Sequence, residues 1–108
     1  MTDIIRVEIE NAVRAITKSM QPQRIYLFGS QSSGTATDGS DIDLCVIASL
    51  GETRKIDALR KMRRAMLPDV NASIDLLVYD ASEFAIRSAM PTTMEYIIAA
   101  EGSLIYEQ

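Results

Sequence analysis

Two apolar segments with a helix-like segment between them constrain the fold of this chain most strongly. The segments DIDLCVIA at 41–48 and SIDLLVY at 73–79 are rich in the residues typical of strands. Between them, residues 52–67 place apolar side chains at helical spacing, and we expect these to face the core: Ile56, Leu59, Met62 and Met66. A strand, a helix and a second strand in this order favour a parallel strand pair.

The other elements place this pair in a mixed sheet. Residues 3–20 are predicted to form a helix, because apolar side chains recur three or four positions apart: Ile5, Ile9, Val13, Ile16 and Met20. Residues 24–28 read as a strand that a loop over 29–40 joins to the next strand, which favours antiparallel pairing. The remaining segments predict helices over 81–90 and 92–101 and an edge strand over 103–106. We therefore predict one domain over 1–108, with an α+β, two-layer fold whose mixed sheet carries its helices on one face.

Composition excludes several classes of function. The net charge is −4 and no block of Lys and Arg dominates, so autonomous binding to DNA is not expected. The chain has no histidine, and its single cysteine excludes an internal disulfide and a cysteine-based metal site. We interpret Cys45 as a small buried residue. No signal peptide or segment of membrane-spanning length is recognisable, and a cytoplasmic location is expected.

Aspartates open both strands of the proposed parallel pair. Asp41 and Asp43 are two positions apart, so their side chains share one face of a strand. Two carboxylates this close repel each other unless a cation lies between them, and Mg²⁺ prefers carboxylate oxygens. Asp75 stands in a second IDL triplet that repeats the triplet around Asp43, and it joins the cluster if the strands are neighbours. Three carboxylates on adjacent strands suit phosphoryl transfer with two metal ions.

Gly29 and Ser30 follow the strand predicted over 24–28. A glycine allows a backbone N–H to approach a phosphate closely, and a serine hydroxyl adds a hydrogen bond. Ten residues separate Ser30 from Asp41, which gives the pattern GS-x10-DxD. Taken singly, each feature also has a structural explanation, namely a turn at Gly29-Ser30 and a polar strand entry at Asp41. The combination favours a nucleotide site.

This pattern resembles the signature of the nucleotidyltransferase superfamily with the DNA polymerase β-like palm. The short chain is similar to the minimal nucleotidyltransferases, the MNT group. The resemblance implies a palm-like mixed sheet, with Gly29 and Ser30 holding the triphosphate of ATP. It also implies that Asp41, Asp43 and Asp75 are the catalytic residues and ligate Mg²⁺, with two ions as the expectation. The implied reaction is attack of a hydroxyl on the α-phosphate, with pyrophosphate leaving.

The resemblance further implies a protein partner. Minimal nucleotidyltransferases often occur with a small helical HEPN protein that resembles a toxin ribonuclease, and the MNT protein is then its antitoxin. Transfer of AMP to that partner would silence it, and a homo- or hetero-oligomer is possible. Two alternatives stay open: an antitoxin that acts by binding alone, and an aminoglycoside-type enzyme acting on a small molecule. Relatives often carry arginines where this chain has Gln31 and Ser33, which favours the first alternative slightly, whereas the lack of a substrate domain weighs against the second.

Overall fold

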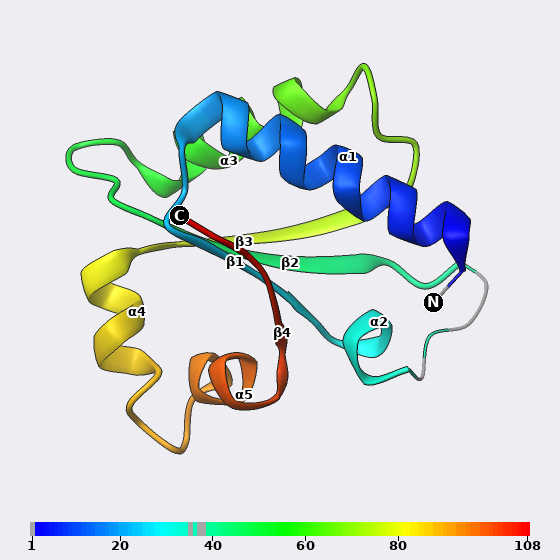
Figure 1. The fold of residues 1–108 in the computed structure, drawn as a ribbon. Helices are drawn as coiled ribbons and strands as arrows, with labels where there is room; N and C mark the ends of the chain where they lie inside the picture. The colour runs from blue at the N-terminus through cyan, green and yellow to red at the C-terminus, as the bar shows by residue number, and fades with distance from the viewer. Residues whose placement is uncertain (1, 35, 37–38) are drawn as a thin grey trace.

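A four-stranded mixed sheet organises the part of the chain that the computed structural model describes, residues 2–34, 36 and 39–108 (Figure 1). The elements follow one another as α1 (Asp3–Met20), β1 (Arg24–Phe28), α2 (Ser30–Ser33), β2 (Ile42–Ala48), α3 (Lys55–Met66), β3 (Ile74–Asp80), α4 (Ala81–Arg87), α5 (Met94–Glu101) and β4 (Ser103–Glu107). The strand order is β3-β2-β1-β4. Strand β2 pairs with β3 in parallel and with β1 antiparallel, which confirms both predicted pairings. The predicted loop over 29–40 includes residues 35, 37 and 38, which lie outside the described residues.

Helices α1 and α3 cover one face of the sheet. The Thr2 side chain caps α1 by accepting a hydrogen bond from the backbone N–H of Ile5. The predicted stripe of α1 packs into the core on this face: Ile5, Ile9, Val13, Ile16 and Met20. In α3 the buried stripe is Ala58, Met62 and Met66. Ile56 is 46% exposed, so its predicted core position was wrong: it lies about 200° around the helix axis from Ala58.

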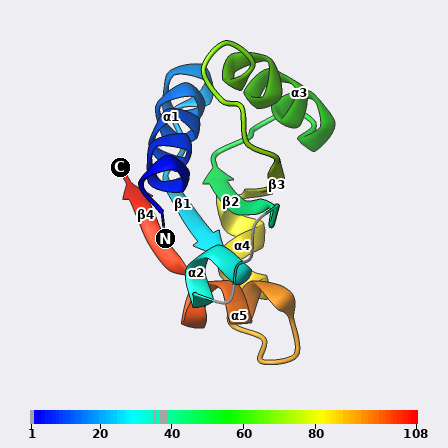
Figure 2. The ribbon, with the colours of Figure 1, turned by 90° about the vertical axis from the view of Figure 1, so that its right-hand side faces the viewer.

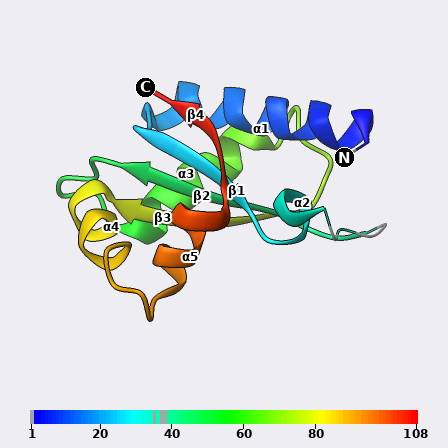
Figure 3. The same cartoon turned by 60° about the horizontal axis from the view of Figure 1, so that its bottom comes forward.

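Helices α4 and α5 cover the opposite face of the same sheet (Figures 1 and 3). Phe84 of α4 and Ile98 of α5 pack there against Cys45 and Ile47 of β2. The α+β class with a mixed sheet is confirmed, but the prediction that all helices lie on one face was wrong. The physical reason is that β2 is buried on both sides, as a nearly continuous apolar strand requires.

Short polar contacts fix the ends of these elements. Asp80 caps α4, because its carboxylate accepts hydrogen bonds from the backbone N–H of Ser82 at 3.2 Å and of Leu50 at 3.0 Å. The carboxylate of Glu83 pairs with the Lys55 ammonium at 2.7 Å, which ties α4 to the start of α3.

Strand β2 begins at Ile42, one residue later than predicted, and leaves Asp41 directly before it. Among the described residues, the helices include none with the length and apolar character needed to cross a membrane.

Candidate active site

Asp43 and Asp75 lie opposite each other on neighbouring parallel strands. The register of β2 and β3 pairs these two residues directly. Asp43 shares a strand face with Cys45, so both carboxylates belong to the face that α4 and α5 cover further along. Helices α4 and α5 do not cover this end of the strands, since Asp43 is half-buried and Asp75 is exposed. The parallel crossover has therefore brought together two carboxylates that are distant in sequence and left them open to a ligand.

The electrostatics of this pair are unfavourable in the protein alone. Burial raises the pKa of Asp43, and the charge of Asp75, a hydrogen bond with it and the charge of Asp41 raise it further. In the described part of the chain, none of the salt bridges involves these three aspartates. The negative charge is thus unbalanced by Lys or Arg, which is the arrangement expected where a cation is to bind.

Gly29 brings the turn after β1 against this carboxylate pair. Strand β1 places Phe28 opposite Asp43, and Gly29 follows with a φ of 72°. A Cβ at this position would overlap the Oδ2 atom of Asp43 and lie 3.2 Å from its Cγ. Residue 29 is therefore glycine for two reasons, the positive φ and the close approach of Asp43. The backbone of Gly29, the first residue of the predicted phosphate-binding pair, therefore lies directly beside Asp43.

Helix α2 carries Gln31 and Ser33, the positions where the resemblance leads us to expect arginine. Ser30 is its first residue and is half-buried. Gln31 is only 9% exposed, whereas Ser33 is exposed. Position 31 thus contributes to the packing of α2 and presents little of its side chain to a ligand in solution.

The oxygen donors fit a hard divalent cation such as Mg²⁺. The structure places Asp43 and Asp75 directly opposite each other on β2 and β3. Asp41 is exposed just before β2 and affects Asp43 through its charge. Among the described residues, no three His, Cys, Asp or Glu side chains gather closely enough to form a complete metal-holding group. A cation would therefore find a pair of carboxylates in place, with Asp41 as the nearby third.

Comparison of the sequence with family models identifies the family. A family model described as "Nucleotidyltransferase domain" matches residues 8–105. The chain belongs to the nucleotidyltransferase domain family. The matched range contains all five predicted site residues: Gly29, Ser30, Asp41, Asp43 and Asp75.

Solved structures share the fold of this nucleotidyltransferase domain. A Sulfolobus solfataricus protein, provisionally assigned as a nucleotidyltransferase, has a TM-score of 0.67 and 20% identity, over 96% of this chain and 83% of that one. A toxin–antitoxin structure with AMP-PNP has a TM-score of 0.57 and 22% identity, over 92% of this chain and 73% of that one. No curated protein matches the sequence. At these identities the likeness establishes the fold.

A buried polar cluster that sequence reasoning missed holds α5 of the nucleotidyltransferase domain in place. Oε1 of Glu95 accepts hydrogen bonds from the Tyr79 hydroxyl at 2.8 Å and from Nε of Arg87 at 3.0 Å. Burial opposes ionisation of Glu95, but these hydrogen bonds outweigh it and lower the pKa of the carboxyl. Among the described residues, Oε2 of Glu95 is buried without a hydrogen-bond partner. No sequence pattern marks Glu95, because its burial depends on how α5 meets β3 and α4.

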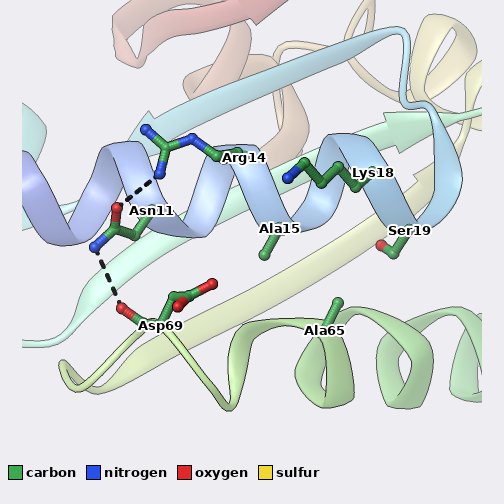
Figure 4. A pocket seen from close by; sticks show the side chains of 7 residues that line it. All are labelled: Asn11, Arg14, Ala15, Lys18, Ser19, Ala65 and Asp69. Carbon is green, nitrogen blue, oxygen red and sulfur yellow. Dashed lines mark hydrogen bonds between the residues drawn. The ribbon is translucent and has the colours of Figure 1, made fainter.

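A separate hollow between α1 and α3 is a weaker candidate for a site. It measures about 230 Å³ and lies on the other face of the sheet from Asp43 and Asp75. Figure 4 shows two hydrogen bonds among the residues that line it, both made by Asn11. Arg14 donates to Oδ1 of Asn11 at 3.1 Å, and Asn11 donates to the backbone carbonyl of Asp69 at 3.2 Å. The Asn11 side chain therefore ties α1 to the segment that follows α3, which is a structural role. The carboxylates at the ends of β2 and β3 remain the stronger candidate for a chemical site.

Proposed function

We propose that this nucleotidyltransferase domain transfers AMP from ATP to an acceptor hydroxyl and releases pyrophosphate. The observation that carries the proposal is the in-register pair Asp43 and Asp75 beside Gly29, at an end of the sheet open to ligands. A site of this kind needs carboxylates next to a backbone that phosphate can approach closely. Positioning and neutralisation of charge then supply most of the rate.

Each residue has a role in this proposal. The backbone at Gly29 and the Ser30 hydroxyl hold the triphosphate. The carboxylates of Asp41, Asp43 and Asp75 would hold Mg²⁺, with two ions as the expectation. Bound Mg²⁺ supplies positive charge that offsets the carboxylates and the phosphates. The exposed Asp75 accepts the proton of the acceptor hydroxyl. The hydroxyl oxygen then bonds to the α-phosphorus, and the bond from that phosphorus to pyrophosphate breaks.

We propose that the acceptor belongs to a small helical HEPN partner, for example a tyrosine hydroxyl, and that the transfer silences a toxin in a hetero-oligomer. Support comes from the fold shared with a toxin–antitoxin structure that contains AMP-PNP. The free and buried Cys45 is consistent with a reducing cytoplasmic location for this reaction.

The decisive experiment is transfer of label from ATP. The chain is purified with its co-expressed partner and incubated with Mg²⁺ and ATP labelled in the α-phosphate. We expect the partner to gain label and the mass of one or more AMP units, and D43N or D75N to abolish both. A partner that stays unlabelled while the chain still neutralises it would contradict the proposal.

A second function, neutralisation by binding alone, is favoured by one observation. Position 31 holds a buried, uncharged glutamine where relatives often have a phosphate-neutralising arginine. The triple change D41N/D43N/D75N separates the two functions. If this variant still neutralises the partner, the chemistry is dispensable and binding alone explains the antitoxin.

A further inference from the structure

A hollow of about 390 Å³ opens beside the candidate active site, between the end of β1, α2, α5 and the start of β4. Its size is typical of small-molecule pockets. Phe28 and Ile98 contribute apolar surface from β1 and α5. Met94 and Ile97, on the same helix, are 49% and 52% exposed and leave apolar surface uncovered. Figure 2 shows α2 and α5 close together at the end of the sheet where the hollow lies.

The hollow shares Gly29 with the surroundings of Asp43, although Asp43 and Asp75 do not line it. Gly29 and Ser30, the proposed phosphate-binding pair, are part of its lining. Phe28, which also lines it, is the register partner of Asp43 on the neighbouring strand. A molecule whose phosphates lie at Gly29 would therefore reach this hollow with its other end.

Charge decides which end of a nucleotide this hollow accepts. Among its described lining residues, Glu101 is the only one with a charged side chain. A carboxylate repels the polyanionic triphosphate, and the apolar side formed by α5 offers phosphate no hydrogen bonds, whereas the serine residues that line the hollow all lie on the α2 side. A neutral base and ribose are compatible with both features, because a carboxylate accepts hydrogen bonds from their N–H or O–H groups.

The wall formed by α5 is built before any ligand binds. Buried Glu95 joins this helix to Tyr79 of β3 and to Arg87 of α4. The Thr93 side chain caps the helix by accepting a hydrogen bond from the backbone N–H of Tyr96 at 3.1 Å. A wall fixed in this way lowers the ordering cost of binding.

We propose that this hollow binds the nucleoside half of the nucleotide, with the base against Met94 and Ile97. Glu101 accepts a hydrogen bond from a donor on the nucleoside, either a ribose hydroxyl or a base amine. The inference rests on the proposed nucleotide transfer and adds the residues that hold the uncharged end of the substrate.

The test compares ATP with tripolyphosphate, each titrated with Mg²⁺ into the purified chain by calorimetry. Tripolyphosphate carries the phosphates alone, so it reports the phosphate site without the hollow. We expect Ile97→Ala to weaken ATP about fivefold and Glu101→Ala about tenfold, with tripolyphosphate affinity unchanged. Ile56→Ala is the matched control, since Ile56 is 46% exposed on α3 and does not line the hollow.

The analogue 2′,3′-dideoxy-ATP, which lacks both ribose hydroxyls, identifies the donor to Glu101. If the donor is a ribose hydroxyl, Glu101→Ala leaves the affinity for this analogue unchanged. If the donor is a base amine, Glu101→Ala weakens that affinity.

The outcomes are distinct. If the wild-type chain binds neither ATP nor tripolyphosphate, the proposed function fails and this inference fails with it. If wild type binds both and the two variants bind ATP as wild type does, the hollow is not the nucleoside site, although the proposed function stands. Equal loss of both ligands in the variants would also overturn the inference, because the substitutions would then act on the phosphate site. Melting curves of every variant establish that the fold is retained.

Discussion

Substitution of Gly29 by alanine tests the close approach of β1 to the carboxylate pair. With a φ of 72° and a ψ of −153°, Gly29 lies in a backbone region used almost only by glycine, and an L-residue there costs about 1–3 kcal/mol. The new Cβ would also overlap the Asp43 carboxylate, whose Cγ lies 3.2 Å from that position. Moving Asp43 off its rotamer adds about 1 kcal/mol. We therefore expect the free energy of unfolding to fall by about 2–4 kcal/mol in urea titrations.

Gly34→Ala is the control for this change, because it also places an L-residue at a positive φ, although in the left-handed helical region. Gly34 has a φ of 79°, but a Cβ there meets nothing within 4 Å. Its substitution should cost only the conformational part, about 1–2 kcal/mol, and leave Mg²⁺ affinity unchanged. Gly29→Ala should weaken Mg²⁺ binding as well, because it displaces one ligand. Equal effects of the two substitutions on stability and on Mg²⁺ affinity, measured by calorimetry, would refute the reasoning.

Two further predictions concern the packing of α4 and α5. Phe84 is 1% exposed and contacts the rings of Tyr26 and Tyr79 at centroid distances of 5.9 and 5.6 Å. Phe84→Ala should therefore lower the free energy of unfolding, measured in urea, by about 3–5 kcal/mol. A loss under about 1 kcal/mol would contradict this packing. Glu95→Gln should flatten the dependence of stability on pH. The folded-state pKa of Glu95 lies below its ordinary value of 4.5. The charged carboxylate therefore stabilises the fold above pH 4.5, and this stabilisation is lost as the pH falls through the folded-state pKa. The measurement is the melting temperature of wild type and variant from pH 7 downward, and parallel curves would show that Glu95 contributes nothing through its charge.

The pairing of Asp43 with Asp75 could be predicted from the sequence because local rules determine it. A helical crossover makes the strand after β2 parallel to it. The period of two was also expected to place Asp41 on the strand face of Asp43, but β2 begins one residue after Asp41. The repeated IDL triplets then align Asp43 with Asp75, as the register confirms. This pairing needs no knowledge of how the remaining helices pack.

The features that could not be predicted depend on contacts between distant segments. The overlap of a Gly29 Cβ with Asp43 follows from the antiparallel register, which no motif encodes. The burial of Glu95 requires α5 to fold back onto β3, so a single acidic residue in a short helix gives no warning of it. The cover on both faces of the sheet did have a signal, because Cys45 and Ile47 interrupt the alternation expected of a half-exposed strand.

The measurement that tests the central claim most directly is the thermal stability of wild type and D43N with and without Mg²⁺ and ATP. Burial and repulsion raise the pKa of Asp43, so its charge destabilises the fold when no cation is present. In metal-free buffer at pH 7, D43N should therefore melt at a higher temperature than wild type. With Mg²⁺ and ATP, wild type should gain stability and D43N should gain little, so that the order reverses. A D43N variant that melts below wild type without metal, or that gains as much from Mg²⁺ and ATP, would contradict the assignment of Asp43 and Asp75 as the cation and nucleotide site.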